Sequence, residues 1–250
     1  MINRVVVESD ERFSTSLGYI KGRVEGVGAK AVLKTDKGGY ARLDIKNLTD
    51  SEVLLGAVAD VIVNDCKAHY ILQNMKLPIR DSFDRHLFIS ALCEFDREMD
   101  KYLALEILQM TPTIVLSGYY DFKLGTLKTR WDEICMIANE NIENLVAEGN
   151  FFELLRYLIS NLEHRIDEAF LECIDGKVRV YDRQMKPLVG VYANESQSEI
   201  ERAISILVAH NPRRIFFWGG ESEFFNRLRN LFCGCVEINA PDELFKIHNA

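Results

Sequence analysis

The sequence lacks any apolar run long enough to cross a bilayer. Its longest apolar window, residues 53–63, is interrupted by Asp60 and is far shorter than the roughly 20 residues that a spanning helix needs. The first residues reach charged side chains within a few positions, so we expect no signal peptide there. The six cysteines are scattered, and without a secretory signal they are typical of reduced thiols. These absences predict a cytoplasmic protein.

The sequence also lacks the common catalytic motifs. It contains no HExxH, no GxSxG and no kinase signature, and its histidines are isolated from one another. The Gly219-Gly220 turn follows an expected strand, but it is neither GxGxxG nor a P-loop, and Glu221 places negative charge where a phosphate would bind. Turn geometry and a phosphate site both remain as interpretations of these glycines.

Metal-binding patterns are equally sparse. Cys233 and Cys235 have one residue between them, whereas structural zinc sites usually have two to four and need four ligands. Two small buried residues around a helix-ending glycine explain the pair as well as a metal site that would include His248 and Cys173. We therefore predict no cofactor.

Positive charge is in short supply. The 30 lysines and arginines are outnumbered by 38 aspartates and glutamates, which gives a net charge of −8 at pH 7. Such a surface disfavours sequence-independent binding of nucleic acid or anionic lipid, although a local basic patch is compatible with it. The hydrophobic content of 48% over 250 residues is enough for a substantial core.

Periodicity divides the chain into three parts and predicts an α+β fold. In an N-terminal αβ unit, residues 1–48, we expect a strand at 2–7 and a helix at 9–24. Asp36-Lys37-Gly38-Gly39 predicts a hairpin between strands at 30–35 and 40–45, since glycine accepts the positive φ of tight turns.

Residues 49–166 are expected to form a helical bundle. Thr49 and Glu52 fit a capping box at the start of a helix that reaches Met75. Asp81 and Ser82 open the next helix. An apolar stripe that predicts one continuous helix after this start consists of Phe88, Leu92, Phe95, Met99, Tyr102 and Leu105.

Residues 167–250 are expected to form a small mixed or parallel αβ sheet unit. Asp175-Gly176 predicts a hairpin between strands at 169–174 and 177–181. Ser196 and Glu199 fit a second capping box, opening a helix that ends near His210. The run RRIFFW, then a helix, then a strand at 236–238 predicts partly parallel pairing.

The chain is organised around residues 112–159. Residues 113–116 are expected to be a short strand, after which Gly118 turns the backbone into an aromatic cluster at 119–122. A second helix from Phe151 is expected to fold back across a turn at 148–150. One apolar stripe along the preceding helix consists of Leu124, Leu127, Trp131, Ile134, Ala138, Ile142 and Leu145.

This stretch carries the one family resemblance. The run GYYDFKL, then Leu127 and Trp131, then FFELLRYLI resembles the central signature of the YtxC-like proteins, a family named for endospore formation. Residues 58–62 and 212–235 fall where that family has similar segments. Family members usually carry Arg where this chain has Lys123, which weakens any bidentate anion recognition there. The resemblance implies a sporulation role and no particular activity.

Two groups of residues are candidates for a site. Asp96 and Asp100, four apart on one expected helix, are placed to share a divalent cation, but Arg97 and Lys101 beside them favour a solvated polar face or an interhelical ion pair. The other group joins aromatic area to cationic heads, and it serves either packing or partner binding. Its members are Tyr119, Tyr120, Lys123 and Arg130. For partner binding we expect Tyr120, Lys123 and Arg130 to be partly exposed and contiguous.

The sequence therefore favours a cytosolic interaction or scaffold protein over an enzyme, with an unidentified protein partner. One alternative is a metal- or nucleotide-dependent enzyme that uses Asp96 and Asp100 or the Gly219-Gly220 turn. The second alternative is a regulator that contacts nucleic acid through a local basic patch.

Overall fold

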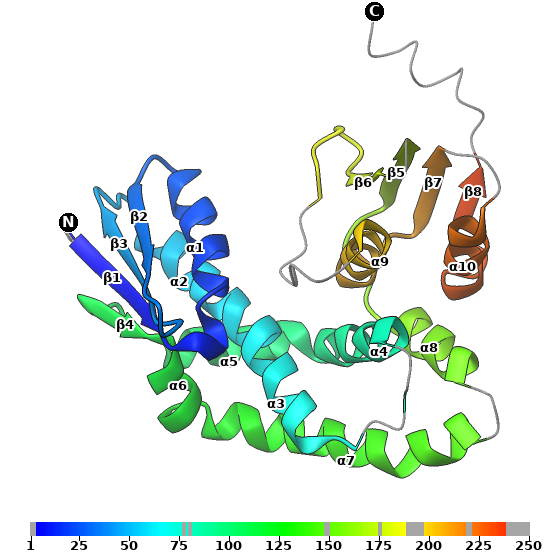
Figure 1. Cartoon of the computed structure of the whole chain (residues 1–250), viewed down its shortest axis with the longest axis horizontal. Coiled ribbons are helices and arrows are strands. Elements are labelled where there is room, and N and C mark those ends of the chain that lie inside the picture. The colour runs from blue at the N-terminus through cyan, green and yellow to red at the C-terminus, as the bar shows by residue number, and fades with distance from the viewer. Residues whose placement is uncertain are drawn as a thin grey trace, which may run out of the picture. The chain divides into compact units, whose positions relative to one another are not determined.

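The computed structural model describes residues 4–76, 79, 82–147, 151–174, 177–188, 198–218 and 222–238. It has the α+β fold that the sequence predicts, with helices and two small mixed sheets (Figure 1). The chain divides into two compact units, the first made of Met1–Met75 and Asp96–Ile137, the second of Lys76–Phe95 and Ala138–Ala250. Residues 49–166, which we expected to form one bundle, are thus divided between the two units.

The first unit is built on a four-stranded sheet of order β2-β3-β1-β4. Strand β1 pairs antiparallel with β3 and parallel with β4, while β2 and β3 form the predicted hairpin. The short strand β4 comes from the central stretch of the chain, far from the others in sequence. The strands span Arg4–Ser9 (β1), Lys30–Thr35 (β2), Ala41–Lys46 (β3) and Thr113–Val115 (β4).

The β2–β3 turn forms for the reason its sequence suggests. Asp36 Oδ1 accepts hydrogen bonds from the backbone N–H groups of Gly38, at 2.9 Å, and Tyr40, at 3.0 Å. Gly39 has φ +79°, and a Cβ there would lie 2.9 Å from Glu11 Cβ. The turn therefore requires glycine both for its backbone conformation and for its close approach to Glu11.

Helices α1 (Ser16–Glu25) and α2 (Ser51–Val61) lie on one side of this sheet (Figure 1). A short 3₁₀ helix at Glu11–Phe13 precedes α1, so the expected helix at 9–24 is only partly correct. The core between these layers is fully buried and apolar, as the alternation along β1 and β3 requires. It includes Val5, Val7, Leu43, Ile45, Leu17, Ile20, Leu54 and Val58.

The start of α2 corrects one prediction. Asp50, not Thr49, is the N-cap, and its carboxylate accepts a hydrogen bond from Glu52 N at 2.8 Å. The helix then continues to Asn74, as expected, but through a π-helical turn at Ile62–Cys66 before α3 (Lys67–Asn74).

The long stripe predicted after residue 82 is interrupted. Helix α4 (Ser82–Glu94) ends before Asp96, whose φ of 52° is left-handed, and α5 (Arg97–Ile107) begins after it. The first half of the stripe is buried at Phe88 and Leu92, but Met99 and Tyr102 are exposed. The prediction of one continuous buried stripe is wrong, because the left-handed residue Asp96 interrupts the helix and the second half of the stripe is exposed.

The central stretch gives two helices in place of the expected turn and helix. Residues 119–122 belong to a short helix, α6 (Leu116–Phe122), and α7 (Gly125–Ala147) follows. Trp131, Leu127, Leu155 and Leu158 are buried, as predicted. The turn expected at 148–150 lies outside the described residues, and α8 (Phe151–Ser160) comes after it.

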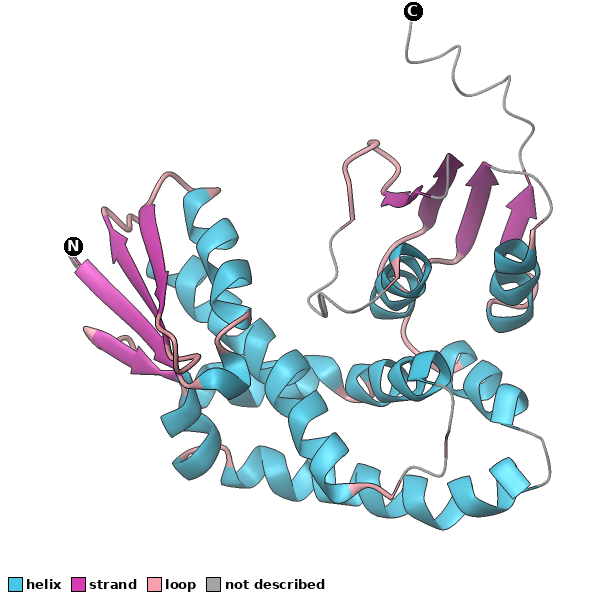
Figure 2. Cartoon of the chain, viewed as in Figure 1, coloured by secondary structure: helices cyan, strands magenta, loops and turns pink. Residues whose placement is uncertain are grey.

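The second unit contains a sheet of order β6-β5-β7-β8, in which β5, β7 and β8 are parallel and β6 is antiparallel, as predicted. Helices α9 and α10 lie on the same side of it (Figure 2). The capping box is formed by Ser198 and Glu201, two residues after the predicted pair. The elements are β5 (Glu168–Ile174), β6 (Lys177–Tyr181), α9 (Glu199–His210), β7 (Arg214–Trp218), α10 (Glu223–Leu231) and β8 (Val236–Ile238).

The two faces of this sheet carry different aromatic contacts. Phe217 meets the rings of Phe224 and Phe225 from α10, with centroids 5.9 and 5.2 Å away. On the opposite face Phe170 stacks between Phe216 and Trp218, with centroids 5.1 and 5.4 Å away. Strand β7 is therefore packed on both of its faces, as its nearly continuous apolar sequence indicates.

Candidate interaction surface

The aromatic and basic residues near Tyr120 do not form the exposed patch that we expected. Tyr120 is only 4% exposed, so its expected exposure is wrong, and its hydroxyl donates to Gln73 Oε1 at 3.2 Å. Tyr119 is half-buried, Lys123 is exposed, and Arg130 makes ion pairs elsewhere. Whether any of these residues binds a partner stays a prediction.

Tyr120 lies between two cations and two rings. Lys128 Nζ is 4.1 Å from its ring centroid and Arg12 Cζ is 5.4 Å away, while the rings of Phe13 and His69 pack against it. Burial, followed by the charge of Cys66, raises the pKa of the Tyr120 hydroxyl to about 12. This cluster joins α6, α7 and the 3₁₀ helix, so its contacts hold the first unit together.

Arg130 belongs to a buried charge centre around Asp100. Lys67 Nζ donates to Asp100 Oδ2 at 2.8 Å, Trp131 Nε1 donates to the same oxygen at 3.0 Å, and Arg130 Nε donates to Oδ1 at 3.1 Å. The side chains of Lys67 and Asp100 are 0% and 1% exposed. Asp96 is 70% exposed and accepts from Arg130 Nη2 at 3.1 Å.

This geometry favours the interhelical ion pair over a shared cation for Asp96 and Asp100. Both oxygens of Asp100 accept hydrogen bonds from charged or indole N–H groups, which occupies the lone pairs that a metal would need. In the described residues, no group of three or more His, Cys, Asp or Glu side chains is arranged to hold a metal ion.

A second carboxylate, Asp60, is bound in the same way. It accepts hydrogen bonds from Tyr19 at 3.0 Å, from Lys101 at 2.7 Å and from Arg97 at 3.4 Å. Burial, together with the charge of Asp60, raises the pKa of Tyr19 to about 12. Arg97 and Lys101, which lie beside Asp96 and Asp100 in the sequence, thus pair with Asp60 of α2.

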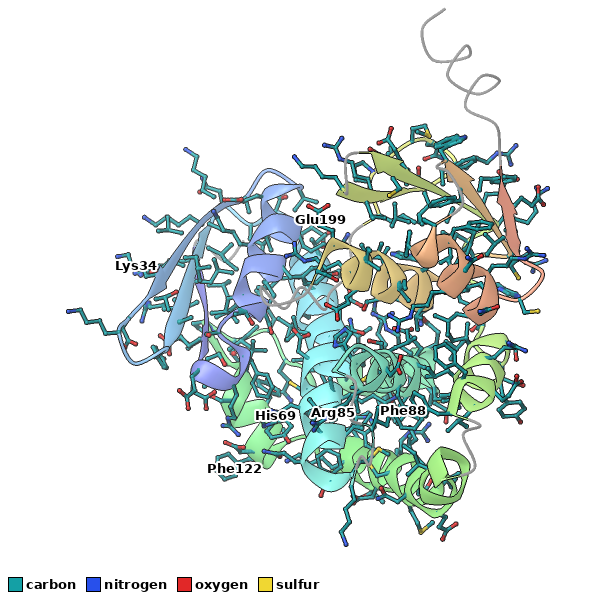
Figure 3. All side chains as sticks on the ribbon, turned by 45° about the vertical axis from the view of Figure 1, so that its right-hand side comes forward. Lys34, His69, Arg85, Phe88, Phe122 and Glu199 are labelled. Atoms are coloured by element: carbon teal, nitrogen blue, oxygen red, sulfur yellow. The ribbon has the colours of Figure 1, made fainter. Side chains whose placement is uncertain are left out.

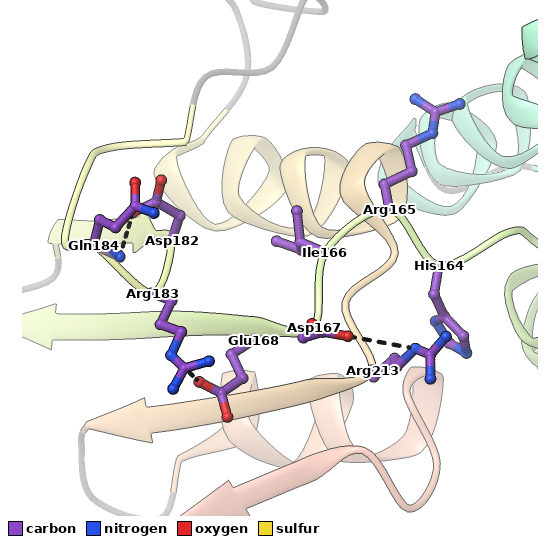
Figure 4. Close-up of a pocket in the computed structure, with 9 residues that line it drawn as sticks. All are labelled: His164, Arg165, Ile166, Asp167, Glu168, Asp182, Arg183, Gln184 and Arg213. Atoms are coloured by element: carbon purple, nitrogen blue, oxygen red, sulfur yellow. Dashed lines mark hydrogen bonds and ion pairs between the residues drawn. The ribbon is translucent and has the colours of Figure 1, made fainter.

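The second unit has a pocket at the amino ends of β5 and β7 (Figure 4). Its volume is about 300 Å³, and its walls carry ion pairs of Arg183 with Glu168 and of Arg213 with Asp167, each at 3.7 Å. Because both signs of charge line it, the pocket selects neither an anion nor a cation. The Gly219-Gly220 turn, for which a phosphate site was one interpretation, is outside the described residues.

The cysteines are not joined in disulfides. All six are free, with Cys66, Cys93 and Cys135 buried. Cys233 and Cys235 line a second cavity of about 270 Å³ between α8 and the end of α10. Gly234 between them has φ +80° but lies three residues after Leu231, the last residue of α10. Cys233 is exposed and Cys235 only half-buried, so the expectation of two buried residues around a helix-ending glycine is wrong.

The surface that sequence reasoning missed is the outer face of the first sheet. The register places five cations on this face, from three neighbouring strands. They are Lys30 and Lys34 of β2, Arg42 and Lys46 of β3, and Arg4 of β1. Figure 3 shows Lys34 extending from the strand on the side away from α1.

Two carboxylates share this face, and the arginines neutralise both. Arg4 Nη2 lies 2.5 Å from Asp44 Oδ1, and Arg42 Nη1 lies 2.7 Å from Glu8 Oε1. Hydrogen bonds from Arg4, and then from Arg42, hold the pKa of Asp44 below its ordinary value. The arginines are thus engaged in ion pairs within the sheet.

The lysines are not engaged. Lys30, Lys34 and Lys46 are exposed and have no ion-pair or hydrogen-bond partner among the described side chains. Lys30 and Lys46 are directly paired across β2 and β3. We name Lys30, Lys34 and Lys46 the lysine face. The signal was present in the sequence, because lysines four apart in a strand point to the same side.

Comparison with known proteins identifies no family for this chain. No protein-family model matches it, and neither curated proteins nor solved structures give a match. The resemblance to YtxC-like proteins therefore stays a prediction. Among the described helices, none combines the length and the apolar character needed to traverse a bilayer.

Proposed function

We propose that this chain is a non-enzymatic interaction protein that binds an acidic partner through the lysine face. The observation that supports this is the set of three exposed lysines that have no partner among the described side chains, on the outer face of a sheet, in a protein of net charge −8. Three like charges so close together repel one another in the free protein, and an acidic ligand relieves that repulsion.

The resemblance in the central stretch adds the proposal that the partner acts in endospore formation, in the cytoplasm. The same lysines suit the phosphates of a nucleic acid, which makes a nucleic-acid-contacting regulator the second candidate. A protein partner is favoured because Val32 and Val115, both exposed, lie on the same face and offer apolar area, whereas recognition of unpaired bases uses aromatic side chains.

The test compares two variants with the same change in net charge. One reverses the lysine face with Lys30→Glu, Lys34→Glu and Lys46→Glu, and the control reverses Lys76, Lys177 and Lys186, which are exposed in the second unit. Both proteins are expressed at native level in sporulating cells, and both should keep the melting temperature of the wild type.

We expect the lysine-face variant to lose the bound partner and to lower spore yield, while the control retains both. Loss of the bound partner after nuclease treatment would instead establish that the chain is a nucleic-acid-contacting regulator. Equal partner recovery and equal spore yield for the two variants would refute the proposal.

A further inference from the structure

The free edge of strand β2 is a place where a partner strand fits. Among the residues that the structure describes, β2, with six residues, pairs only with β3, whereas the other edge strands β4 and β8 have three residues each. The outer side of β6 is partly occupied, because Leu188 N donates to Val180 O at 2.8 Å. In the described part of the chain, β2 is therefore the longest unpaired edge.

The backbone of β2 has a defined set of outward-facing groups. Asp36 N donates to Tyr40 O at 2.9 Å, so Asp36 belongs to the set of residues that face β3. Because the ladder of an antiparallel pair alternates, Ala31, Leu33 and Thr35 direct their N–H and C=O groups away from β3. The paired register is regular over the whole strand, without a bulge or a proline.

The side chains of β2 define what this edge accepts. Lys30, Val32 and Lys34 alternate onto the lysine face, and Val32 is 54% exposed between the two cations. A strand laid beside β2 places its own side chains directly opposite these three, and opposite charges and apolar pairs at such positions are favourable. We propose that the partner is a protein segment that adds to β2 as a strand with an acidic, apolar, acidic alternation.

The same geometry argues against a second copy of this chain as the occupant. Two β2 strands paired antiparallel about Val32 would place Lys30 of each opposite Lys34 of the other, and like charges directly opposite are unfavourable. Lysines on an edge strand also discourage indiscriminate pairing. The repulsion between facing lysines and the lysines' effect on unspecific pairing both favour an acidic strand over a second copy of β2. This inference rests on the proposed function, and it adds the binding mode and the pattern of the partner.

The probe is a short labelled peptide in which glutamates flank a valine at alternate positions, a pattern that reads the same in both directions. Two further peptides carry backbone N-methyl groups on every second amide. The first peptide is methylated on one alternating set of amides, and the second peptide on the other set. Only one set faces β2 in a paired strand, so one methylated peptide should bind like the parent and the other should lose binding. Binding is measured by fluorescence anisotropy with the full chain.

Two measurements on the protein complete the test. The variant with Lys30→Glu and Lys34→Glu should bind the parent peptide at least about tenfold more weakly, because two favourable cross-strand pairs become unfavourable. The control with Lys177→Glu and Lys186→Glu, both exposed in the second unit, should bind it like the wild type. The amide protons of Ala31, Leu33 and Thr35 should gain protection from hydrogen exchange when the peptide is bound.

The outcomes separate the two levels of the proposal. One outcome would be binding that depends on the lysines, is equal for both methylated peptides and leaves the amides of Ala31, Leu33 and Thr35 unprotected. This outcome would overturn strand addition and support an acidic partner on the lysine face. Binding that is unchanged by reversal of Lys30 and Lys34 would overturn both. Failure of the parent peptide to bind, or stronger competition from an oligonucleotide of equal charge, would also overturn strand addition.

Discussion

Replacement of Asp100 by asparagine removes the carboxylate charge that faces Lys67 in the interior of the first unit. The Lys67 ammonium lies 2.8 Å from Asp100 Oδ2, with both side chains inaccessible to solvent. The neutral amide keeps the shape of the site and loses the charge. We therefore expect a large loss of stability without a change of fold.

The magnitude follows from the asymmetry of buried ion pairs. Removing one member of such a pair typically costs about 3–5 kcal/mol, because the other charge remains in a poorly solvated site. Asp96→Asn is the matched control, since Asp96 also pairs with Arg130 but is 70% exposed. An exposed pair contributes about 1 kcal/mol or less. The two variants should thus differ by several kcal/mol.

The assay is urea unfolding followed by tryptophan fluorescence. The chain has two tryptophans, Trp131 in the first unit and Trp218 in the second, so a Trp218→Phe background reports on the first unit alone. A double variant, Lys67→Met with Asp100→Leu, should cost less than the two single changes added together, because neither Lys67 nor Asp100 is left as a fully buried charge, and Arg130 is partly exposed and keeps its ion pair with Asp96. If Asp100→Asn costs no more than Asp96→Asn, the reasoning is refuted.

Three further predictions concern the first unit. Burial raises the pKa of Asp65 to about 7, so between roughly pH 4 and pH 7 the folded state binds more protons than the unfolded state, and stability falls as pH rises. Asp65→Asn should remove that fall in stability between pH 5 and pH 8, measured by urea unfolding. Identical pH profiles for the wild type and the variant would contradict this prediction. Gly39→Ala should lower the free energy of unfolding by about 1 kcal/mol or more, seen as a lower melting temperature, because φ at Gly39 is +79° and Glu11 lies close. Gly38→Ala should have a smaller effect. Equal losses for the two variants would show that position 39 has no special requirement for glycine. Asp50→Ala should lower the free energy of unfolding by about 0.5–2 kcal/mol through loss of the N-cap of α2, whereas Thr49→Ala should be nearly neutral. A larger loss for Thr49→Ala than for Asp50→Ala in a denaturant titration would restore Thr49 as the cap.

Local patterns were sufficient to predict most strands and hairpins. The β2–β3 and β5–β6 pairs were predicted from alternation and turn residues, and the end of α9 at His210 from the proline at 212. Each of these features depends on residues close in sequence. Turn and helix-end chemistry is therefore visible without knowledge of the fold.

The errors fall where distant contacts decide. Apolar spacing continues through Asp96, so periodicity alone gave no sign of the left-handed residue that separates α4 from α5. The cap at Asp50 was assigned to its neighbour because both residue types cap helices well. Asp100, Lys67 and Trp131 come from three helices, and no spacing in the sequence associates them.

The candidate surface was open to prediction in principle. Once residues 30–35 and 41–46 are paired, their alternation places Lys30, Lys34 and Lys46 on one side. Closeness in the sequence instead favours Tyr120 and Arg130, because aromatic and basic residues lie near one another there. The absence of partners for the lysines became visible only in the folded sheet, since it depends on Arg4 and Arg42 engaging the two nearby carboxylates.

The π-helical turn at Ile62–Cys66 sets the rotational phase of α3. The buried residues Val58, Ile62, Lys67 and Ile71 are separated by four, five and four positions, and the step of five crosses that turn. A regular α-helix advances roughly 100° per residue, so deletion of one residue there would rotate α3 by that angle about its own axis. Lys67 would then turn away from Asp100 although no charged residue had been altered. The length of this segment, more than its composition, thus specifies the charge centre.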